Sequence, residues 1–475
     1  MTELQHAAKA TRPRIQPAEE GDRRPLSVSA RLGRLQFHQS GKFRVLQFAD
    51  IQDGPKVSKD TISLIEASLD ATRPDLVIFN GNQIAGYDSA YALTFRKRRW
   101  DARPASASSE ASGERYAAAL EHTRELVRAT IEQLVHPLAD RGVPWAVTFG
   151  NHDFQCGLDN DEIESICREF PGCINPERAA DGTTGIAVKH GVKHGVKHDV
   201  GDMEQDFGLP EQPVIACAPG TFALSVTDVD RTYDVLGLVL LDSGDYARSG
   251  GYGSPSEAAL RFLADAPGLM AAQSQQLQQD RQDEQDSPRE PRKTPSTLPC
   301  MVFQHFPIEQ YYRLLKPVAA TAARAIEGYR NFAGRHFVLN EDKTQPGSYL
   351  GEGVSCPDAD SGEFAILDKA GYFAISAGHD HRNAFVGSVP VGTDGDRQMM
   401  MVASPTSGFG SYGPVPAKRA ARLFEFDIRH PYEPRTQLLE YDELVGKPSA
   451  GKAYAYGMTS ESKPDSEGID RKSVV

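Results

Sequence analysis

The chain has no long apolar run, no dense cysteine framework and no basic stripe, and each absence excludes a class of protein. No segment approaches the roughly 18 apolar residues that a membrane span needs. The six cysteines are scattered without a CxxC pair, which predicts reduced thiols. Because the N-terminus also lacks the apolar core of a signal peptide, we expect a cytoplasmic protein. A net charge of −13 without a cationic face argues against binding to duplex nucleic acid.

The 475 residues include 39% hydrophobic and 25% charged residues, which is typical of a soluble globular protein with a sizeable core. Strand patterns alternate with helix patterns in the first half, which predicts right-handed βαβ units, a partly parallel sheet and an α/β fold. These segments span residues 43–50, 58–72, 75–82, 115–142 and 144–151. The second half is richer in strands, at residues 232–245, 299–307, 371–381, 398–405 and 422–428.

The composition predicts one folded domain over residues 31–440, between flexible tails at residues 1–30 and 441–475. Three inserts interrupt the domain. Two of them are poor in branched apolar residues and rich in polar residues, so we expect mobile surface segments. The inserts span residues 101–115, 180–207 and 270–299.

The second insert contains a repeated VKHG unit that places His190, His194 and His198 four residues apart. On a helix these imidazoles would face one side, as metal ligands do. The glycines of the repeat disfavour that helix. A short duplication in a tolerant loop explains the pattern, so we expect no metal site there.

Five hydrophobic runs each end in residues that can bind a metal ion. Ligands bind at the carboxyl ends of strands in open α/β sheets, so we expect these ends to meet. Imidazole, carboxylate and amide groups together are typical ligands of Zn, Mn or Fe, and Gly81, Gly150 and Gly378 allow the sharp turns that convergence requires. The residues are Asp50, Gln52, Asn82, Asn151, His152, His305, His379 and His381.

Several of these segments resemble the ordered motifs of the calcineurin-like metallophosphoesterases: GNHD at 150–153, FQHFPIEQY at 303–311 and GHDH at 378–381. The blocks LQFAD, RPDLVIFNG, LDSGDY and GHDHRNAF are similar to the purple-acid-phosphatase-like branch. The resemblance covers roughly residues 41–430. It implies a four-layer αββα sandwich of two mixed β-sheets flanked by helices, and a metal-dependent phosphoester hydrolase.

The resemblance also implies two divalent metal ions, Mn, Fe or Zn, and assigns their ligands. Gln52 stands where the family has a histidine, and Asn82 stands where it has the aspartate that bridges the metals. Losing the anionic bridge between two cations predicts a weak second site. The implied ligands are Asp50, Gln52, Asn82 and His381 for one metal, and Asn82, Asn151, His305 and His379 for the other.

The implied reaction is attack of a metal-activated hydroxide on phosphorus, with His152 protonating the leaving group. Asp153 either orients the ring of His152 or caps the following helix. The expected substrate is a small phosphoester or a phosphoprotein. Tyrosines in the loops at 241–256 and 309–312 are either lid residues or packing residues, and no substrate-binding residue is predicted. The alternative hypothesis is a degenerate, non-catalytic member of the family that acts as a binding or regulatory module.

Overall fold

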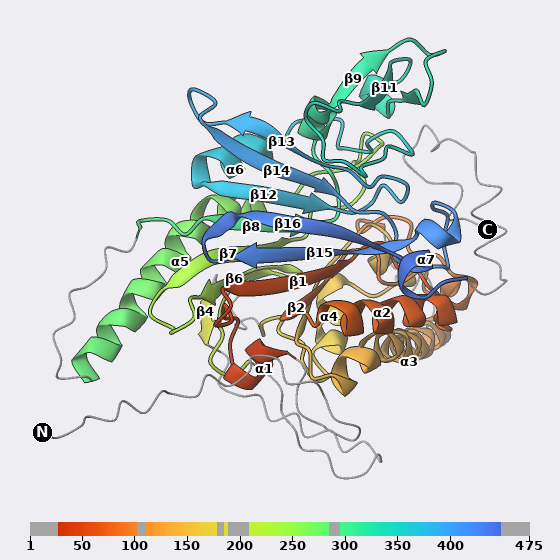
Figure 1. Ribbon diagram of the computed structural model, residues 1–475. Coiled ribbons are helices and arrows are strands. Elements are labelled where there is room, and N and C mark those ends of the chain that lie inside the picture. The colour runs from red at the N-terminus through yellow and green to blue at the C-terminus, as the bar shows by residue number, and fades with distance from the viewer. Residues whose placement is uncertain (1–26, 102–109, 178–184, 189–208, 285–294, 448–475) are drawn as a thin grey trace, which may run out of the picture.

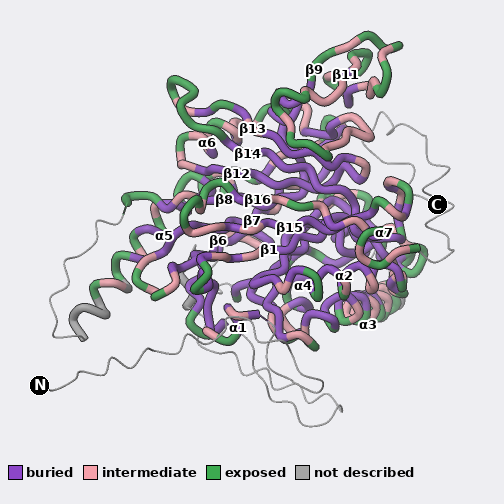
Figure 2. Tube along the Cα trace, viewed as in Figure 1, coloured by how far each residue is buried: buried purple, intermediate pink, exposed green. Residues whose placement is uncertain are grey.

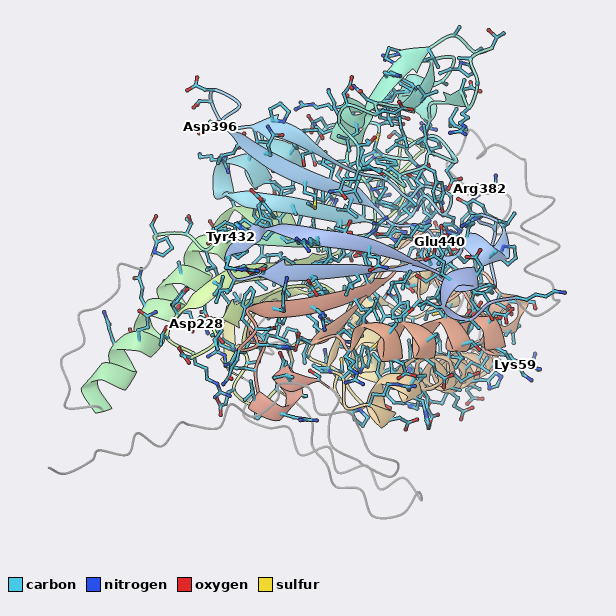
Figure 3. The ribbon with its side chains drawn as sticks, viewed as in Figure 1. Lys59, Asp228, Arg382, Asp396, Tyr432 and Glu440 are labelled. Atoms are coloured by element: carbon cyan, nitrogen blue, oxygen red, sulfur yellow. The ribbon has the colours of Figure 1, made fainter. Side chains whose placement is uncertain are left out.

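Two large β-sheets, stacked face to face, form the centre of the protein, and helices cover the outer face of each (Figure 1). The computed structural model describes residues 27–101, 110–177, 185–188, 209–284 and 295–447. The strands of both sheets are mostly buried, as Figure 2 shows. Charged side chains such as Lys59 and Asp396 project outward (Figure 3).

The first sheet has the strand order β16-β15-β1-β2-β3. Strands β1, β2 and β3 are parallel, whereas β15 and β16 are antiparallel to their neighbours. Helix α2 (Lys59–Thr72) connects β1 to β2, and α3 (Glu110–Asp140) connects β2 to β3, which confirms the predicted βαβ units. The strands are β1 Lys42–Phe48, β2 Leu76–Asn80, β3 Trp145–Thr148, β15 Ala420–Asp427 and β16 His430–Glu440.

The second sheet has the order β13-β14-β12-β8-β7-β6-β5-β4. Its middle strands β7, β8, β12 and β14 are parallel, and the other pairings are antiparallel. Both large sheets are therefore mixed. The strands are β4 Gly185–Val188, β5 Pro213–Ala218, β6 Thr221–Thr227, β7 Asp234–Leu241, β8 Cys300–Gln304, β12 Tyr372–Ala377, β13 Val386–Val391 and β14 Arg397–Ala403.

A small third sheet, β10-β11-β9, projects beyond one end of the second sheet (Figure 1). It contains β9 Leu315–Val318, β10 Ile326–Glu327 and β11 His336–Leu339. The remaining helices are α1 Val28–Leu32, α4 Asn160–Cys167, α5 Glu257–Glu284, α6 Glu363–Ala370 and α7 Tyr441–Leu444. Short 3₁₀ helices are η1 Ser89–Tyr91, η3 Asp153–Cys156, η4 Glu309–Leu314, η5 Arg330–Phe332 and η6 Pro416–Lys418.

Three apolar clusters separate the four layers. Alternating residues of one strand point to opposite faces, so each central strand contributes to two clusters. In β1, Val45 packs between the sheets and Leu46 packs against the helices beside the first sheet. In β8, Met301 packs between the sheets and Val302 faces the helices beside the second sheet. The predicted four-layer sandwich is confirmed.

The structure corrects the insert at 270–299. Helix α5 continues through Glu284, and Met270 and Ala271 are buried in the cluster beside the second sheet. The apolar residues at the start of this helix bury against the sheet, and this packing outweighs the polar composition that suggested a mobile loop. Residues 285–294 lie outside the described part.

The observed boundaries of the other inserts and of the tails also differ from the boundaries predicted from the sequence. Helix α3 begins at Glu110, within the predicted insert at 101–115. Strand β4 lies within the insert at 180–207 and pairs with β5, while the three repeat histidines lie outside the described residues. Ala30 is buried in α1 and Tyr441 is buried in α7, so both predicted tails contain residues that belong to the folded domain.

None of the six cysteines forms a disulfide, and only Cys217 is partly exposed. Within the described ranges, no helix is both long and apolar enough to cross a membrane.

Candidate metal centre

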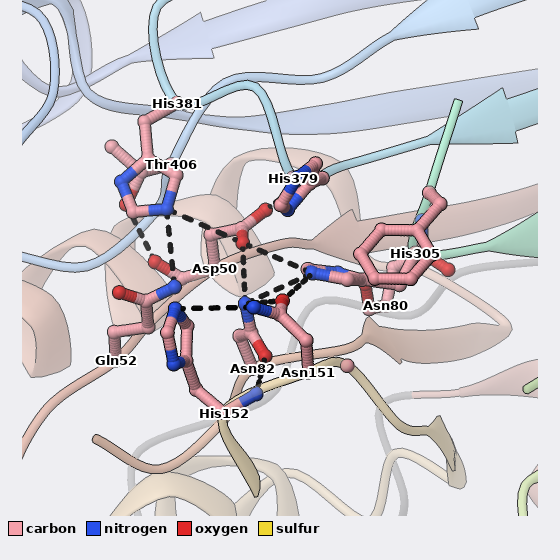
Figure 4. A network of polar contacts seen from close by, with 12 residues as sticks. Asp50, Gln52, Asn80, Asn82, Asn151, His152, His305, His379, His381 and Thr406 are labelled. Atoms are coloured by element: carbon pink, nitrogen blue, oxygen red, sulfur yellow. Dashed lines mark hydrogen bonds and ion pairs between the residues drawn. The ribbon is translucent and has the colours of Figure 1, made fainter. Parts of the chain in front are cut away.

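The predicted site residues come together where the carboxyl ends of parallel strands from both sheets meet (Figure 4). From the first sheet, Asp50 and Gln52 follow β1, Asn82 follows β2, and Asn151 follows β3. From the second sheet, histidines follow β8 and β12. They are His305, His379 and His381.

Three glycines allow this convergence, as the sequence predicted. A Cβ atom on Gly81 would clash with the ring of His305, and one on Gly150 would clash with the side chain of Asn82. A Cβ atom on Gly378 would lie 2.7 Å from Oδ2 of Asp50. Each glycine therefore permits a close approach between loops that a larger residue would prevent.

Four of the site residues have left-handed backbone conformations that are uncommon outside glycine. The φ angles are 51° for Asp50, 44° for Gln52, 55° for Asn82 and 69° for His379. Such conformations cost roughly 1–3 kcal/mol each and persist only where the surrounding structure enforces them. This strain concentrates at the strand ends that hold the predicted ligands.

Two of the histidines direct Nε2 into the site, because a backbone carbonyl binds the other ring nitrogen. Nδ1 of His305 lies 3.3 Å from the carbonyl oxygen of Asn80, and Nδ1 of His381 lies 2.7 Å from that of Tyr412. Each Nδ1–H donates to its carbonyl, so the neutral ring carries its lone pair on Nε2. This arrangement is typical of histidines that bind metal ions. Burial alone would lower the pKa of His381, but Asp50, 3.4 Å from its Nε2, raises it.

One divalent cation fits the donor set of Asp50, His305 and His379, because one ligand atom from each lies within 4.8 Å of the others. Burial lowers the pKa of His305 and of His379, which favours the neutral imidazoles that metals require. Burial alone would raise the pKa of Asp50, but His305 and His381 hold it below its usual range. Asp50 therefore supplies a charged carboxylate.

Asn151 is held in place by Tyr246. The amide nitrogen of Asn151 donates to the Tyr246 hydroxyl over 2.7 Å, and it also lies 3.3 Å from Nε2 of His152. Its amide oxygen consequently faces Nε2 of His305 at 3.1 Å. This oxygen therefore lies beside the donor set of Asp50, His305 and His379.

Asn82 presents its amide nitrogen, not its oxygen, to the ligand cluster. The oxygen accepts the backbone N–H of His152 over 2.8 Å. The nitrogen lies 2.9 Å from Nε2 of His305 and 3.2 Å from an oxygen of both Asp50 and Asn151. An amide N–H has no lone pair for a metal, so Asn82 as placed does not fit the predicted bridging role.

Gln52 has a similar orientation. The Tyr87 hydroxyl donates to its amide oxygen over 3.1 Å, and its amide nitrogen lies 3.1 Å from Nε2 of His381. The nitrogen thus faces the ring atom that the predicted ligand His381 would offer to a metal, and an amide nitrogen has no lone pair of its own to offer. Gln52 as placed therefore does not fit the predicted role of a metal ligand.

His152 lies beside the cluster, with Nε2 toward Asn151 and Nδ1 bound to Gln155. The Nδ1–H donates to the side-chain oxygen of Gln155 over 2.7 Å. The ring packs edge-on against Tyr87, with centroids 4.9 Å apart. Burial lowers the pKa of His152 to about 4, so the free protein holds a neutral ring.

Neither role expected for Asp153 is found. Its carboxylate accepts the backbone N–H groups of Gly150, Asn82 and Ile84 over 2.8–3.1 Å. The following helix α4 is instead capped by Asp159. Asp153 thus joins the loops after β2 and β3, while Gln155 orients His152.

The tyrosines of the loops at 241–256 and 309–312, expected to be either lid or packing residues, divide into two groups. Tyr252 packs on the ring of His379, with centroids 4.3 Å apart, and Tyr246 contacts Asn151, so both belong to the site. Tyr311 and Tyr312 are buried in the core beside the second sheet, as the packing interpretation predicted. Sequence reasoning gave no role to Gln155 or Tyr87, whose only signal is proximity to the motif residues.

The convergence of the motif residues and the relatives below support a calcineurin-like metallophosphoesterase of the purple-acid-phosphatase-like branch. The chain is 22% identical over 391 residues to phosphatase DCR2 of Saccharomyces cerevisiae, covering 76% of this chain and 47% of the relative. It thus spans about half the length of that protein. The chain is also 22% identical over 414 residues to probable inactive purple acid phosphatase 28 of Arabidopsis thaliana, covering 82% of this chain and 77% of the relative. No family model matches.

Two solved structures are distantly similar. The match to PhoD has a TM-score of 0.38 and 10% identity, covering 85% of this chain and 69% of that chain. The match to purple acid phosphatase PPD1 from yellow lupin (Lupinus luteus) seeds has a TM-score of 0.32 and 10% identity, covering 87% of this chain and 57% of that chain.

Proposed function

We propose that the chain is a metal-dependent phosphoester hydrolase. One observation carries this proposal: ligand atoms of Asp50, His305 and His379 lie within 4.8 Å of one another, with the amide oxygen of Asn151 3.1 Å from Nε2 of His305 and the imidazole of His152 next to Asn151. The name of the yeast relative, a phosphatase, supports the same reaction class.

Asp50, Asn151, His305 and His379 would hold the cation, and their mixed nitrogen and oxygen donors suit Zn, Mn or Fe. A bound divalent cation would supply Lewis-acid polarisation of the phosphoryl oxygens and a lowered pKa for water. Because Asn151 is fixed by Tyr246 and His305 by the carbonyl of Asn80, these donors need little rearrangement.

His152 would transfer a proton through Nε2, because Gln155 occupies Nδ1. The neutral ring of the free protein must first gain a proton at Nε2 to act as the acid for the leaving group. The negative charge of a bound phosphoester favours this imidazolium form. Gln155 then holds the ring in one orientation while the proton moves.

The walls of the centre are aromatic. Tyr246, Tyr252, Phe306 and Tyr329 form a buried cluster next to His379. Such walls exclude water from the reacting group. We propose a small phosphoester or a phosphoprotein as the substrate. The six cysteines, none of which forms a disulfide, support a reducing compartment, the cytoplasm.

A second candidate function is a non-catalytic binding or regulatory module. The observation in its favour is the amide nitrogen of Asn82 at the position where the family has a bridging carboxylate. The Arabidopsis relatives named as probable inactive enzymes are compatible with this alternative.

A hydrolysis assay distinguishes the two functions. Protein purified without chelator is assayed with 4-nitrophenyl phosphate and bis(4-nitrophenyl) phosphate in Zn²⁺, Mn²⁺ or Fe²⁺, beside His379→Ala as the control. We expect turnover that a chelator abolishes and that His379→Ala lacks. If loaded wild-type protein hydrolyses neither ester but still binds inorganic phosphate, the binding module replaces the enzyme.

A further inference from the structure

The half of the site that faces Gln52 and His381 offers hydrogen-bond donors where the resemblance implies ligands for a second cation. The amide nitrogen of Asn82 is directed at oxygens of Asp50 and Asn151, and the amide nitrogen of Gln52 is directed at Nε2 of His381 (Figure 4). Both residues are buried, and both hold the left-handed backbone conformation.

The orientation of Asn82 is fixed by a partner on its oxygen. Reversing this amide would set its NH₂ group against the backbone N–H of His152, which now donates to the oxygen over 2.8 Å. Two donors would then face each other in a buried site, which costs about 1–3 kcal/mol for each group left unsatisfied. For Gln52, the hydroxyl of Tyr87 occupies the oxygen over 3.1 Å.

The charge of the site also opposes a second cation. Among the predicted ligands, Asp50 is the only carboxylate, and Asn82 cannot supply the anionic bridge that offsets repulsion between two cations about 3.5–4 Å apart. The three-residue donor set of Asp50, His305 and His379 includes neither amide. A cation held by this set would take the lone pairs of Asp50 and His305 that now face the amide nitrogen of Asn82, so the hydrogens of Asn82 could bind a different acceptor.

We propose that this centre binds a single divalent cation, and that the amides of Asn82 and Gln52 replace the second cation as donors to a phosphoryl oxygen. The number of bound cations can be measured whether or not the protein is an enzyme. Only the choice of a phosphoryl group as the ligand rests on the proposed function. The centre is therefore a site with one metal and an oxyanion pocket formed by amides.

Metal stoichiometry tests the first half of the proposal. Metal-free protein is dialysed against Zn²⁺, and bound zinc is measured by mass spectrometry for wild type, Asn82→Asp, and Asn82→Asp combined with Gln52→His. Asp and His both tolerate the left-handed conformation of these positions, so the backbone should be kept. We expect one zinc per wild-type chain and two in the double variant.

Asn331→Asp adds the same charge at an exposed position and is the matched control, for which we expect one zinc. Thermal unfolding of each variant with and without Zn²⁺ verifies that it folds. Two zinc ions of similar affinity in the wild-type protein would overturn the proposal, and so would a double variant that folds but still binds one.

Binding of inorganic phosphate tests the second half. With one equivalent of Zn²⁺ present, calorimetry should show at least tenfold weaker phosphate binding for Asn82→Ala than for wild type, while the zinc content of the variant stays at one. Unchanged phosphate affinity in a zinc-loaded Asn82→Ala would refute the amide pocket. A protein that binds one zinc and phosphate but hydrolyses no ester would refute the proposed function and keep this inference.

Discussion

The Nδ1–H of His152 donates to the side-chain oxygen of Gln155 over 2.7 Å, within the short helix η3 that follows β3. Because one ring nitrogen is occupied in this way, the other is the only one that can exchange a proton with a substrate. The pair therefore sets both the tautomer and the direction of the imidazole.

Replacing His152 tests its role as the acid. His152→Ala should lower turnover of aryl phosphoesters by about 10²–10⁴-fold, as expected for loss of a general acid, because no other proton donor holds that position. Zinc content should stay equal to that of wild type, since the ring is not among the proposed ligands. A loss of zinc together with activity would show instead that His152 supports the metal centre.

Gln155→Met removes the acceptor of the His152 proton while keeping the side-chain length. We expect turnover to fall by about tenfold, because the ring can then adopt the other tautomer or rotate. The effect should depend on the ring, so Gln155→Met should change little in the His152→Ala background. A double-mutant cycle on turnover measures this coupling, and additive losses would contradict it.

Tyr246→Phe should weaken zinc binding by about 10–100-fold, because it removes the acceptor that directs Asn151. Tyr432→Phe is the control, since Tyr432 lies on β16 and its hydroxyl bonds to the backbone of Val235 (Figure 3). Competition with a chromogenic chelator gives both affinities. Equal affinities for the two variants would show that Tyr246 does not position the ligand.

Glu363→Gln should make the protein more stable at alkaline pH. Burial raises the pKa of Glu363 from 4.5 to about 7, although Gln304 opposes the shift. The folded state thus binds the proton more tightly, so this group's contribution to the free energy of unfolding is fully present below about pH 4.5 and is lost as the pH rises through 7.

The free energy of unfolding of Glu363→Gln, relative to that of wild type, should therefore increase by roughly 2–3 kcal/mol from pH 5 to pH 8. Urea unfolding at both pH values measures this difference, and the exposed substitution Glu341→Gln is the control. A difference that is independent of pH would mean that Glu363 titrates normally in the folded protein.

The sequence predicted the central strands because they are uninterrupted apolar runs that are buried on both faces. It did not predict β16, in which Pro431 and Pro434 stand within the strand. Proline is tolerated there because β16 lies at the edge of its sheet. The length of α5 was also missed, because only the tertiary contacts of Met270 and Ala271 show that the polar segment continues a packed helix.

For the site, the ends of the strands and their glycines were enough to predict which residues converge. The direction of each amide could not be predicted, because it depends on partners from other loops. The backbone N–H of His152 fixes Asn82, and the hydroxyl of Tyr87 contacts Gln52. The role of Asp153 was missed for the same reason, since three backbone N–H groups from two loops occupy its carboxylate.

The ligands come from two separate sheets: Asp50 and Asn151 follow strands of one, and His305 and His379 follow strands of the other. A cation bound to all four would join the two halves of the molecule across a sequence separation of more than 300 residues between Asp50 and His379. Metal would therefore slow the separation of the sheets more than it would slow local opening within either one. Hydrogen exchange with and without Zn²⁺ would then show protection along the interface between the sheets. The zinc affinity of the protein would therefore report whether the two sheets are packed together.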